Sequence, residues 1–291
     1  MASRKIVRVV TAHQQKEGAG FLVRRPVPTA SLEQFDPFLL LDEVGPVSYR
    51  PGEAIGAPDH PHRGFETVSY ILAGEKLHED STGKSQLLKA GDVQWMTAGA
   101  GIVHSELPGP DFKASGGLAH GFQIWVNLPA ADKSARPGYQ YLPASAIPTA
   151  VSSDGLVEVT VIAGKAFGVS AAIGTHTPIW LQDWRVRPGA AARIAIDLDF
   201  NVAAYVFEGA VYFGLSRDRV ARGQMAMLGE GTALEFSVLE GDDVGRFLLL
   251  AGTPIREPLA RYGPFVMNNT DELRTAVADF QSGRMGVIAR S

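Results

Sequence analysis

Two short histidine-containing stretches are the part of the sequence best suited to chemistry. His60-Pro61-His62 places two imidazoles two residues apart, and His104-Ser105-Glu106 places an imidazole and a carboxylate at the same spacing. In an extended strand, residues i and i+2 point to the same face of the sheet. If the two strands lie side by side, the four side chains converge, and we expect them to hold one ion.

The ligand types restrict the kind of ion. Three neutral imidazoles and one carboxylate, with coordination positions left open, suit a divalent first-row transition metal that does oxygen or Lewis-acid chemistry. The chain has no cysteine, which excludes zinc–cysteine sites, iron–sulfur clusters and thiol nucleophiles. Since a single His-x-His also arises by chance, the prediction depends on the two pairs together.

The remaining histidines carry weaker signals. His78 lies in a charged segment, and we expect it to be a solvated turn residue. His120 precedes an alternating apolar–polar run, which is typical of a core histidine or of one that orients a site. His13 and His176 have no partner nearby in the sequence.

The elements that must position these residues read as short strands. The chain has 291 residues, of which 32 are glycine and 18 are proline, so turns are frequent. Runs rich in Val, Ile, Tyr, Phe and Trp lie between turn residues, a pattern that predicts an all-β barrel or sandwich. These runs are Thr67–Leu72, Ser85–Leu88, Val93–Met96, Gln123–Val126, Val157–Ile162, Ile194–Ile196, Ala203–Phe207, Val211–Leu215, Thr232–Val238 and Phe247–Ala251.

One helix is predicted, near the C-terminus. Asn269 or Thr270 could cap a segment that runs from 271 to 281, with Leu273, Val277 and Phe280 on one stripe. Acidic residues in its first turn suit the helix dipole. We expect this helix to pack against the barrel as a brace.

An internal repeat is indicated by similar offsets between two halves of the chain. The segment 70–74 resembles 205–209 at an offset of 135, and a Met followed by a Gly-rich turn at 96 recurs at 227, an offset of 131. These offsets favour one β unit used twice, with chance matching of Gly-rich segments as the alternative. The Pro/Ala-rich stretch 129–150 has the composition of a linker between the copies.

Charge and hydropathy exclude several classes of partner. Lys plus Arg number 27 and Asp plus Glu number 31, a formal net charge of −4, so we expect no direct nucleic-acid binding. No run approaches the roughly 20 apolar residues that span a bilayer, and the first residues lack the apolar core of a secretory signal. We therefore expect a cytoplasmic protein without membrane contact.

Several motifs together resemble the pirin family of cupins. They are PDHPHRGFETV at 58–68, GDVQWMTAG at 91–99, GIVHSE at 101–106, FLLLD at 38–42, QIWVNLP at 123–129 and GPFVMN at 263–268. The resemblance implies a bicupin, that is, two stacked antiparallel β-barrels (a double jelly roll), with tails that cross between them. We place a metal-binding barrel at 1–135 and a second barrel at 136–291 that ends in a helix packed back on the first.

The resemblance also implies a ligand set. The pirin metal residues fall on His60, His62, His104 and Glu106, whereas Glu66, where other cupins place a carboxylate ligand, is expected to be structural or to support the ligands. Iron is the expected ion, with Mn, Ni, Cu and Zn as alternatives. At the corresponding offsets the second half has no imidazole, so we expect no metal there.

The activity implied by the resemblance is quercetinase: a flavonol binds through its 3-hydroxyl and is cleaved by dioxygen, with Glu106 as the candidate base. Phe38, Phe65 or Trp95 could stack on a planar substrate, although each is also a plausible core residue. The alternative is a non-enzymatic, iron-dependent regulatory protein that senses metal oxidation state and binds a transcription cofactor or a metabolic enzyme. Two barrels packed on each other form a closed unit, so a monomer is expected.

Overall fold

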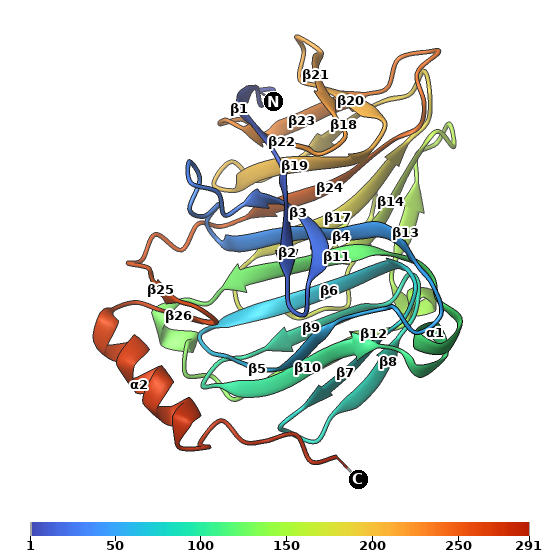
Figure 1. Cartoon of the computed structure of the whole chain (residues 1–291). Helices are drawn as coiled ribbons and strands as arrows, with labels where there is room; N and C mark the ends of the chain where they lie inside the picture. Colours follow the sequence, from blue (N-terminus) through green and yellow to red (C-terminus); the bar gives the residue numbers. More distant parts are fainter. Residues whose placement is uncertain (1, 291) are drawn as a thin grey trace. The chain divides into compact units, whose positions relative to one another are not determined.

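The computed structural model describes residues 2–290, and most of its regular structure is β-strand (Figure 1). The chain divides into two compact units, each assembled from separate segments. We call residues 14–34, 38–146 and 255–290 the N-barrel unit, and residues 2–13, 35–37 and 147–254 the C-barrel unit. The predicted all-β architecture with a short C-terminal helix is confirmed.

The N-barrel unit contains two antiparallel sheets. Their strand orders are β12-β9-β6-β11-β4-β3-β2 and β5-β10-β7-β8. The strands are β2 (His13–Glu17), β3 (Phe21–Val27), β4 (Phe38–Tyr49), β5 (Ala57–His62), β6 (Phe65–Ala73), β7 (Lys76–Asp80), β8 (Ser85–Leu88), β9 (Val93–Thr97), β10 (Ile102–Pro108), β11 (Gly117–Asn127) and β12 (Gly138–Leu142). The unit also holds α1 (Pro110–Ser115), the 3-10 turns η1 (Ala130–Asp132) and η2 (Ala144–Ala146), the hairpin β25 (Ala260–Tyr262) and β26 (Phe265–Met267), and α2 (Thr270–Gln281).

The C-barrel unit has the same plan. Its sheets have the orders β1-β22-β19-β24-β17-β14-β13 and β18-β23-β20-β21, and a small hairpin pairs β15 with β16. The strands are β1 (Ile6–Thr11), β13 (Thr149–Val151), β14 (Val157–Ala163), β15 (Lys165–Ala166), β16 (Val169–Ser170), β17 (Ile179–Val186), β18 (Ala191–Ala195), β19 (Asn201–Glu208), β20 (Ala210–Phe213), β21 (Asp218–Ala221), β22 (Gln224–Leu228), β23 (Ala233–Ser237) and β24 (Gly245–Gly252).

The internal repeat predicted from the offsets is visible in this topology. In the large sheets, the run β9-β6-β11-β4 of one unit corresponds to β22-β19-β24-β17 of the other, and in the small sheets β5-β10-β7-β8 corresponds to β18-β23-β20-β21. The two matched sequence segments lie in β6 and β19, at equivalent places in the two sheets. One β unit is therefore used twice.

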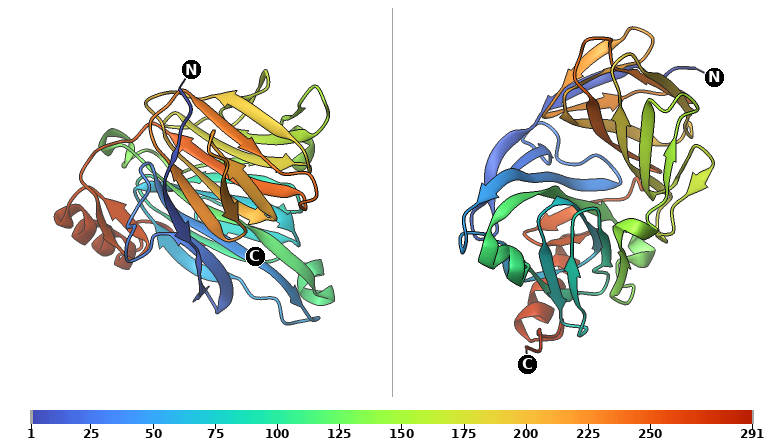
Figure 2. Two further views of the ribbon diagram at one scale, coloured as in Figure 1. Left: turned by 90° about the horizontal axis from the view of Figure 1, so that it is seen from above. Right: turned by 90° about the vertical axis from the view of Figure 1, so that its right-hand side faces the viewer.

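The C-terminal helix packs on strands of the N-barrel unit. Asn269 is the N-cap, because its Oδ1 accepts a hydrogen bond from the backbone N–H of Glu272 at 3.0 Å. Leu273 is buried in a cluster that contains Val103 of β10 together with residues of β26. In both views of Figure 2 the helix lies at the outer side of its unit. No helix of residues 2–290 is long and apolar enough to cross a membrane.

The core of the C-barrel unit is organised around aromatic rings. The ring of Phe247 on β24 lies 5.0 Å from that of Phe236 and 5.2 Å from that of Phe213, and it stacks parallel to Trp184. All four side chains are buried. The four rings come from four different strands, and these strands cannot move together to fill the space that a removed ring would leave.

Truncating this cluster is expected to destabilise the protein. Phe247→Ala should lower the free energy of unfolding by about 3–5 kcal/mol, because it removes buried apolar surface and leaves a cavity. Equilibrium urea unfolding followed by circular dichroism measures the change. Leu215→Ala is the control, since Leu215 is 78% exposed, and it should change the free energy by no more than about 0.5 kcal/mol. Equal effects of the two substitutions would contradict the described core.

Candidate metal centre

The two histidine-containing stretches lie on adjacent antiparallel strands, as predicted. In the pairing of β10 with β5, His104 lies opposite His60 and Ile102 lies opposite His62. The other edge of β10 pairs with β7, where Glu106 lies opposite His78. Strand pairing therefore brings His60 and His104, 44 positions apart in sequence, to one place.

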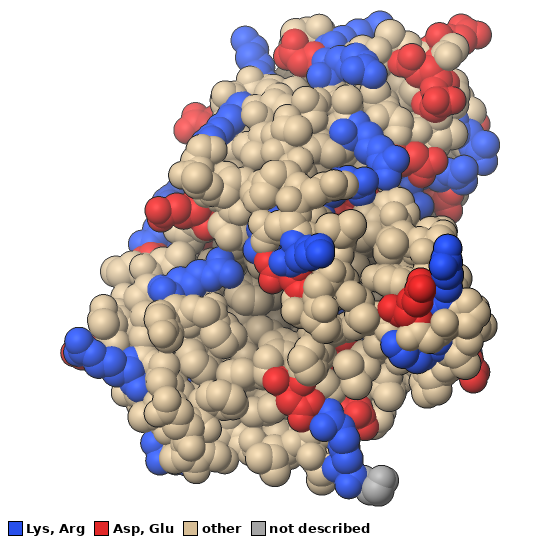
Figure 3. All heavy atoms as spheres, viewed as in Figure 1, with Lys and Arg blue, Asp and Glu red and all other residues tan. Residues whose placement is uncertain are grey.

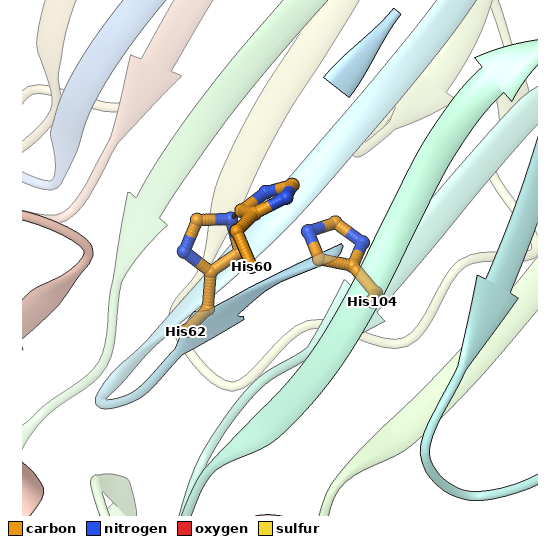
Figure 4. A group of neighbouring side chains, drawn as sticks. All are labelled: His60, His62 and His104. Atoms are coloured by element: carbon orange, nitrogen blue, oxygen red, sulfur yellow. Dashed lines mark hydrogen bonds between the residues drawn. The ribbon is translucent and has the colours of Figure 1, made fainter. Parts of the chain in front are cut away.

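Three imidazoles converge on one point (Figure 4). The ring centroids of His60 and His104 are 4.3 Å apart, and those of His62 and His104 are 4.9 Å apart. One nitrogen from each ring lies within 4.8 Å of the other two. The Nε2 atoms of His60 and His62 are separated by only 3.1 Å.

Backbone carbonyls fix the tautomers of two of these rings. The Nδ1 of His60 lies 2.7 Å from the carbonyl oxygen of Pro58, and the Nδ1 of His62 lies 3.4 Å from that of Pro264. A carbonyl oxygen only accepts, so each Nδ1 carries the hydrogen and each Nε2 presents a lone pair. Two lone pairs at 3.1 Å repel each other unless a cation or a proton lies between them.

His104 completes a donor set that fits a metal ion. Both of its ring nitrogens are buried and have no hydrogen-bond partner among residues 2–290. Burial, with the neighbouring His60, lowers the pKa of His62 to about 3, and burial with the adjacent imidazoles holds the pKa of His104 well below its usual value. The rings of His62 and His104 are therefore neutral at pH 7, which is the form that ligates metals.

Glu106 is held as a carboxylate beside this group. Its Oε1 accepts hydrogen bonds from Ser69 Oγ at 2.8 Å and Gln94 Nε2 at 2.9 Å, and Lys76 Nζ lies 3.2 Å away. Burial alone would raise the pKa of Glu106, but the positive field of Lys76 and His78 and the bond from Ser69 outweigh it and lower the pKa to about 2.

The four predicted ligands do not form a single group: they belong to two groups that share His104. The oxygen of Glu106 lies within 4.8 Å of ligand nitrogens of His104 and His78, but Glu106 does not join the group of His60, His62 and His104. A register shift in the β10–β5 pairing between His104 and Glu106 accounts for the difference, because β5 has one extra residue at that point.

The prediction that His78 is a solvated turn residue is wrong. His78 is fully buried in β7, and its Nε2 lies 2.9 Å from Asp80 Oδ2. Charged neighbours usually indicate a solvated segment, but Asp80 is itself buried and is the hydrogen-bond partner of the imidazole.

Glu66 is buried and accepts a hydrogen bond from Thr97 Oγ1 at 2.7 Å, in keeping with the structural role expected for it.

Two of the three histidines, His60 and His62, open onto a cavity of about 550 Å³ within the N-barrel unit. His60, His62 and Glu106 line it together with Lys76 and Trp125. His120 also lines it and is paired with Glu43 at 3.0 Å. In Figure 3 the surface is hollowed in this region, with basic and acidic side chains at the edge of the depression.

The aromatic residues on the cavity wall are not the predicted ones. Phe38, Phe65 and Trp95 are fully buried and do not line the cavity. Trp125 lines it instead: its ring lies 5.1 Å from that of His62, and the guanidinium of Arg261 lies 4.9 Å above it. The alternating apolar–polar run around Trp125 predicted a strand, but it did not predict which face of that strand lines the cavity.

The C-terminal segment binds the outer face of the sheet that contains β5, β10 and β7. Arg290 hydrogen-bonds to Asp59 and lies 3.6 Å from Glu79 and 3.5 Å from Ser105 Oγ. Each of these three partners is the sequence neighbour of a histidine, on β5, β7 and β10. The side chains alternate, so the histidines face inward where Arg290 binds the outside.

Comparison with known proteins identifies the family. The sequence model described as Pirin matches residues 20–126, and that of the Pirin C-terminal cupin domain matches residues 181–286. Human Pirin is 41% identical over 290 residues, which cover 98% of this chain and 95% of the human protein. The chain belongs to the pirin family.

Other pirin relatives are similar over the same length. A Pirin-like protein of Solanum lycopersicum is 41% identical over 284 residues, covering 97% of this chain and 93% of that protein. A crystal structure named quercetin 2,3-dioxygenase from Acinetobacter baumannii has a TM-score of 0.92 at 35% identity, covering 99% of this chain and 100% of that one. The predicted resemblance and the two-cupin fold of the pirins are thus confirmed.

The second cupin of this pirin has a different interior at the corresponding strands. In the β18–β23 pairing, Ile194 lies opposite Leu234, and both are buried in the apolar core together with Phe236. Arg193 and Glu235 form an ion pair at 3.0 Å, and the arginine side chain is half exposed. Apolar side chains therefore fill the interior side of this strand pair.

The buried imidazoles predict an acid-sensitive fold in the metal-free pirin. The pKa of His62 is about 3 in the folded protein and about 6.5 when unfolded. As the pH falls below 6.5, the unfolded state binds the proton and the folded state does not. Stability is therefore full above pH 6.5 and falls by about 1.4 kcal/mol per pH unit for this group below it. Urea unfolding of the metal-free protein at pH 7.5 and 5.0 measures the loss.

His62→Gln should reduce the slope of this dependence, since a glutamine does not titrate, and the contribution of His104 remains. The control is His176→Gln, which removes an exposed imidazole of the C-barrel unit and should leave the slope unchanged. Equal slopes for the parent protein and His62→Gln would show that the neutral buried imidazole is not the origin of the effect.

Proposed function

We propose that this pirin is a metal-dependent dioxygenase that cleaves quercetin or a related flavonol with O2. The observation that carries the proposal is the convergence of three imidazoles beside a cavity of about 550 Å³, which His60 and His62 line, with His104 buried next to them. A cavity of this size suits a small aromatic molecule. The likeness to a structure named quercetin 2,3-dioxygenase supports the choice of substrate class.

The proposed metal ligands are His60, His62, His104 and Glu106. We propose iron, whose preference for imidazole and carboxylate donors is shared by Mn, Ni, Cu and Zn to different degrees. The chemistry that the metal supplies when bound is Lewis-acid polarisation and electron exchange with dioxygen. The tautomers fixed by the carbonyls of Pro58 and Pro264 aim the lone pairs of His60 and His62 at the ion.

Glu106 is the proposed acceptor of the proton from the flavonol 3-hydroxyl. The contacts from Ser69, Gln94 and Lys76 all go to its Oε1, so Oε2 is available to a substrate. A carboxylate with a pKa of about 2 is a weak base, and it accepts the proton only from a hydroxyl whose own acidity rises on binding. The ammonium of Lys76, which also lines the cavity, would stabilise the oxyanion that remains.

Trp125 is the proposed stacking surface for the flavonol. Its ring is backed by Phe65 at 4.3 Å and covered on part of its surface by Arg261. Rigid packing of this kind holds a planar ligand in one orientation, and the apolar wall excludes water from the reacting carbon atoms.

Two substitutions test the catalytic proposal. In iron-loaded protein, Glu106→Gln should lower the rate of oxygen consumption with quercetin by at least about 100-fold, because the carboxylate that accepts the proton is lost. His62→Ala should abolish turnover together with iron binding. An oxygen electrode measures turnover, and metal analysis of the same samples separates loss of iron from loss of catalysis.

Glu158→Gln, an exposed carboxylate of the C-barrel unit, is the matched control and should leave turnover unchanged. If the fully iron-loaded parent protein consumes no oxygen with quercetin, the dioxygenase proposal is wrong. The non-enzymatic regulator then becomes the better hypothesis, and pull-downs with the ferrous and ferric forms should recover different amounts of a protein partner.

A further inference from the structure

A second group of candidate ligands lies beside the first, on the β7 side of β10. Ligand atoms of His78, His104 and Glu106 lie within 4.8 Å of one another. In the β10–β7 pairing, Glu106 lies opposite His78 and His104 lies opposite Asp80. The pairing in this region is regular, so the sheet itself sets the spacing of the group.

His78 is oriented in the way that metal-binding histidines are. Its Nε2 contacts Asp80 Oδ2 at 2.9 Å, and Asp80 Oδ1 accepts hydrogen bonds from the backbone N–H and the hydroxyl of Thr82 at 2.8 and 2.6 Å. With an ionised Asp80, the Nε2 of His78 donates, and in the neutral ring its Nδ1 then keeps a lone pair. That Nδ1 is buried and has no partner among residues 2–290.

His104 belongs to both groups and has a nitrogen for each. Both of its ring nitrogens are buried without a hydrogen-bond partner in the described part of the chain. In Figure 4 one nitrogen faces His60 and His62, and the other lies on the opposite side of the ring. A histidine that served only the first group would leave this second nitrogen desolvated and unpaired, which is costly in a protein interior.

We propose that His78, His104 and Glu106 form an inner binding position for a divalent cation, distinct from the outer position between His60, His62 and His104. The inner donors are two imidazoles and a carboxylate, a set with a smaller share of imidazole than the four ligands proposed for iron, so the inner position favours Mn2+. Lys76 opposes a cation there, but its side chain is 21% exposed and can turn toward the cavity. The shared His104 and Glu106, and the repulsion between two divalent ions, make the positions alternatives.

The test separates the two positions by removing the outer donors. Metal-free full-length His60→Gln/His62→Gln protein is titrated with Mn2+, and the free ion is counted from its electron paramagnetic resonance signal. We expect one equivalent to bind. Adding His78→Gln to this background should weaken Mn2+ binding at least 10-fold, whereas adding His176→Gln, the control, should leave it unchanged.

A conservative variant guards against a folding defect. In the same background, Asp80→Asn keeps the size of the side chain but can donate to Nε2 of His78, which moves the hydrogen to Nδ1 and removes the lone pair. Binding should weaken at least 10-fold while circular dichroism and the melting temperature of the metal-free protein stay within the range of the control. Should the double substitution prevent folding, His60→Gln alone takes its place.

The proposal is overturned if the outer-site variant binds no Mn2+, or if its Mn2+ affinity is the same with and without His78→Gln and Asp80→Asn. Both results are independent of dioxygenase activity, because the assay contains only the metal and the protein. The inner position can therefore fail while the proposed function stands, and the reverse also holds.

Discussion

The metal-binding part of this pirin depends on one constraint: lone pairs on imidazole nitrogens are held facing one another. An unpaired polar group in a protein interior costs about 1–3 kcal/mol; both ring nitrogens of His104 are in that position, and His60 and His62 bring further ligand nitrogens to within 4.8 Å. The fold holds them there through the β5–β10 pairing and through the carbonyls of Pro58 and Pro264. A divalent cation relieves the repulsion between these lone pairs. The arrangement of the strands therefore makes the free energy of metal binding more favourable.

The two cupins show that the β plan and the chemistry are separable. The same strand order surrounds histidines in one unit and apolar side chains in the other. In the β5–β10 pair His104 lies opposite His60, whereas in the β18–β23 pair the buried Leu234 lies opposite the buried Ile194. Those apolar side chains lose no hydrogen bonds on burial, and the removal of their surface from water stabilises the folded unit. The polar interior of the first unit is retained at a cost in stability, as is common at functional sites.

The sequence predicted the convergence of the histidines because the i, i+2 spacing has only one meaning in a strand. It could not predict the surroundings. Every residue of β9 is buried, so apolar character near the motif did not distinguish Trp95, in the core, from Trp125, on the cavity wall. His78 was missed for a related reason: charged neighbours usually mark a solvated segment, but Asp80 is buried as its hydrogen-bond partner. Such pairings depend on which strands become neighbours, and local sequence does not contain that information.

The register of β10 explains why the ligands form two groups. On the β5 side, the pairing shifts between His104 and Glu106, and the extra residue on β5 carries Glu106 away from His60. On the β7 side the pairing is regular, so Glu106 stays opposite His78. Because β10 pairs with β5 along one edge and with β7 along the other, His104 has two sets of neighbours, and the carboxylate is nearer to the inner one.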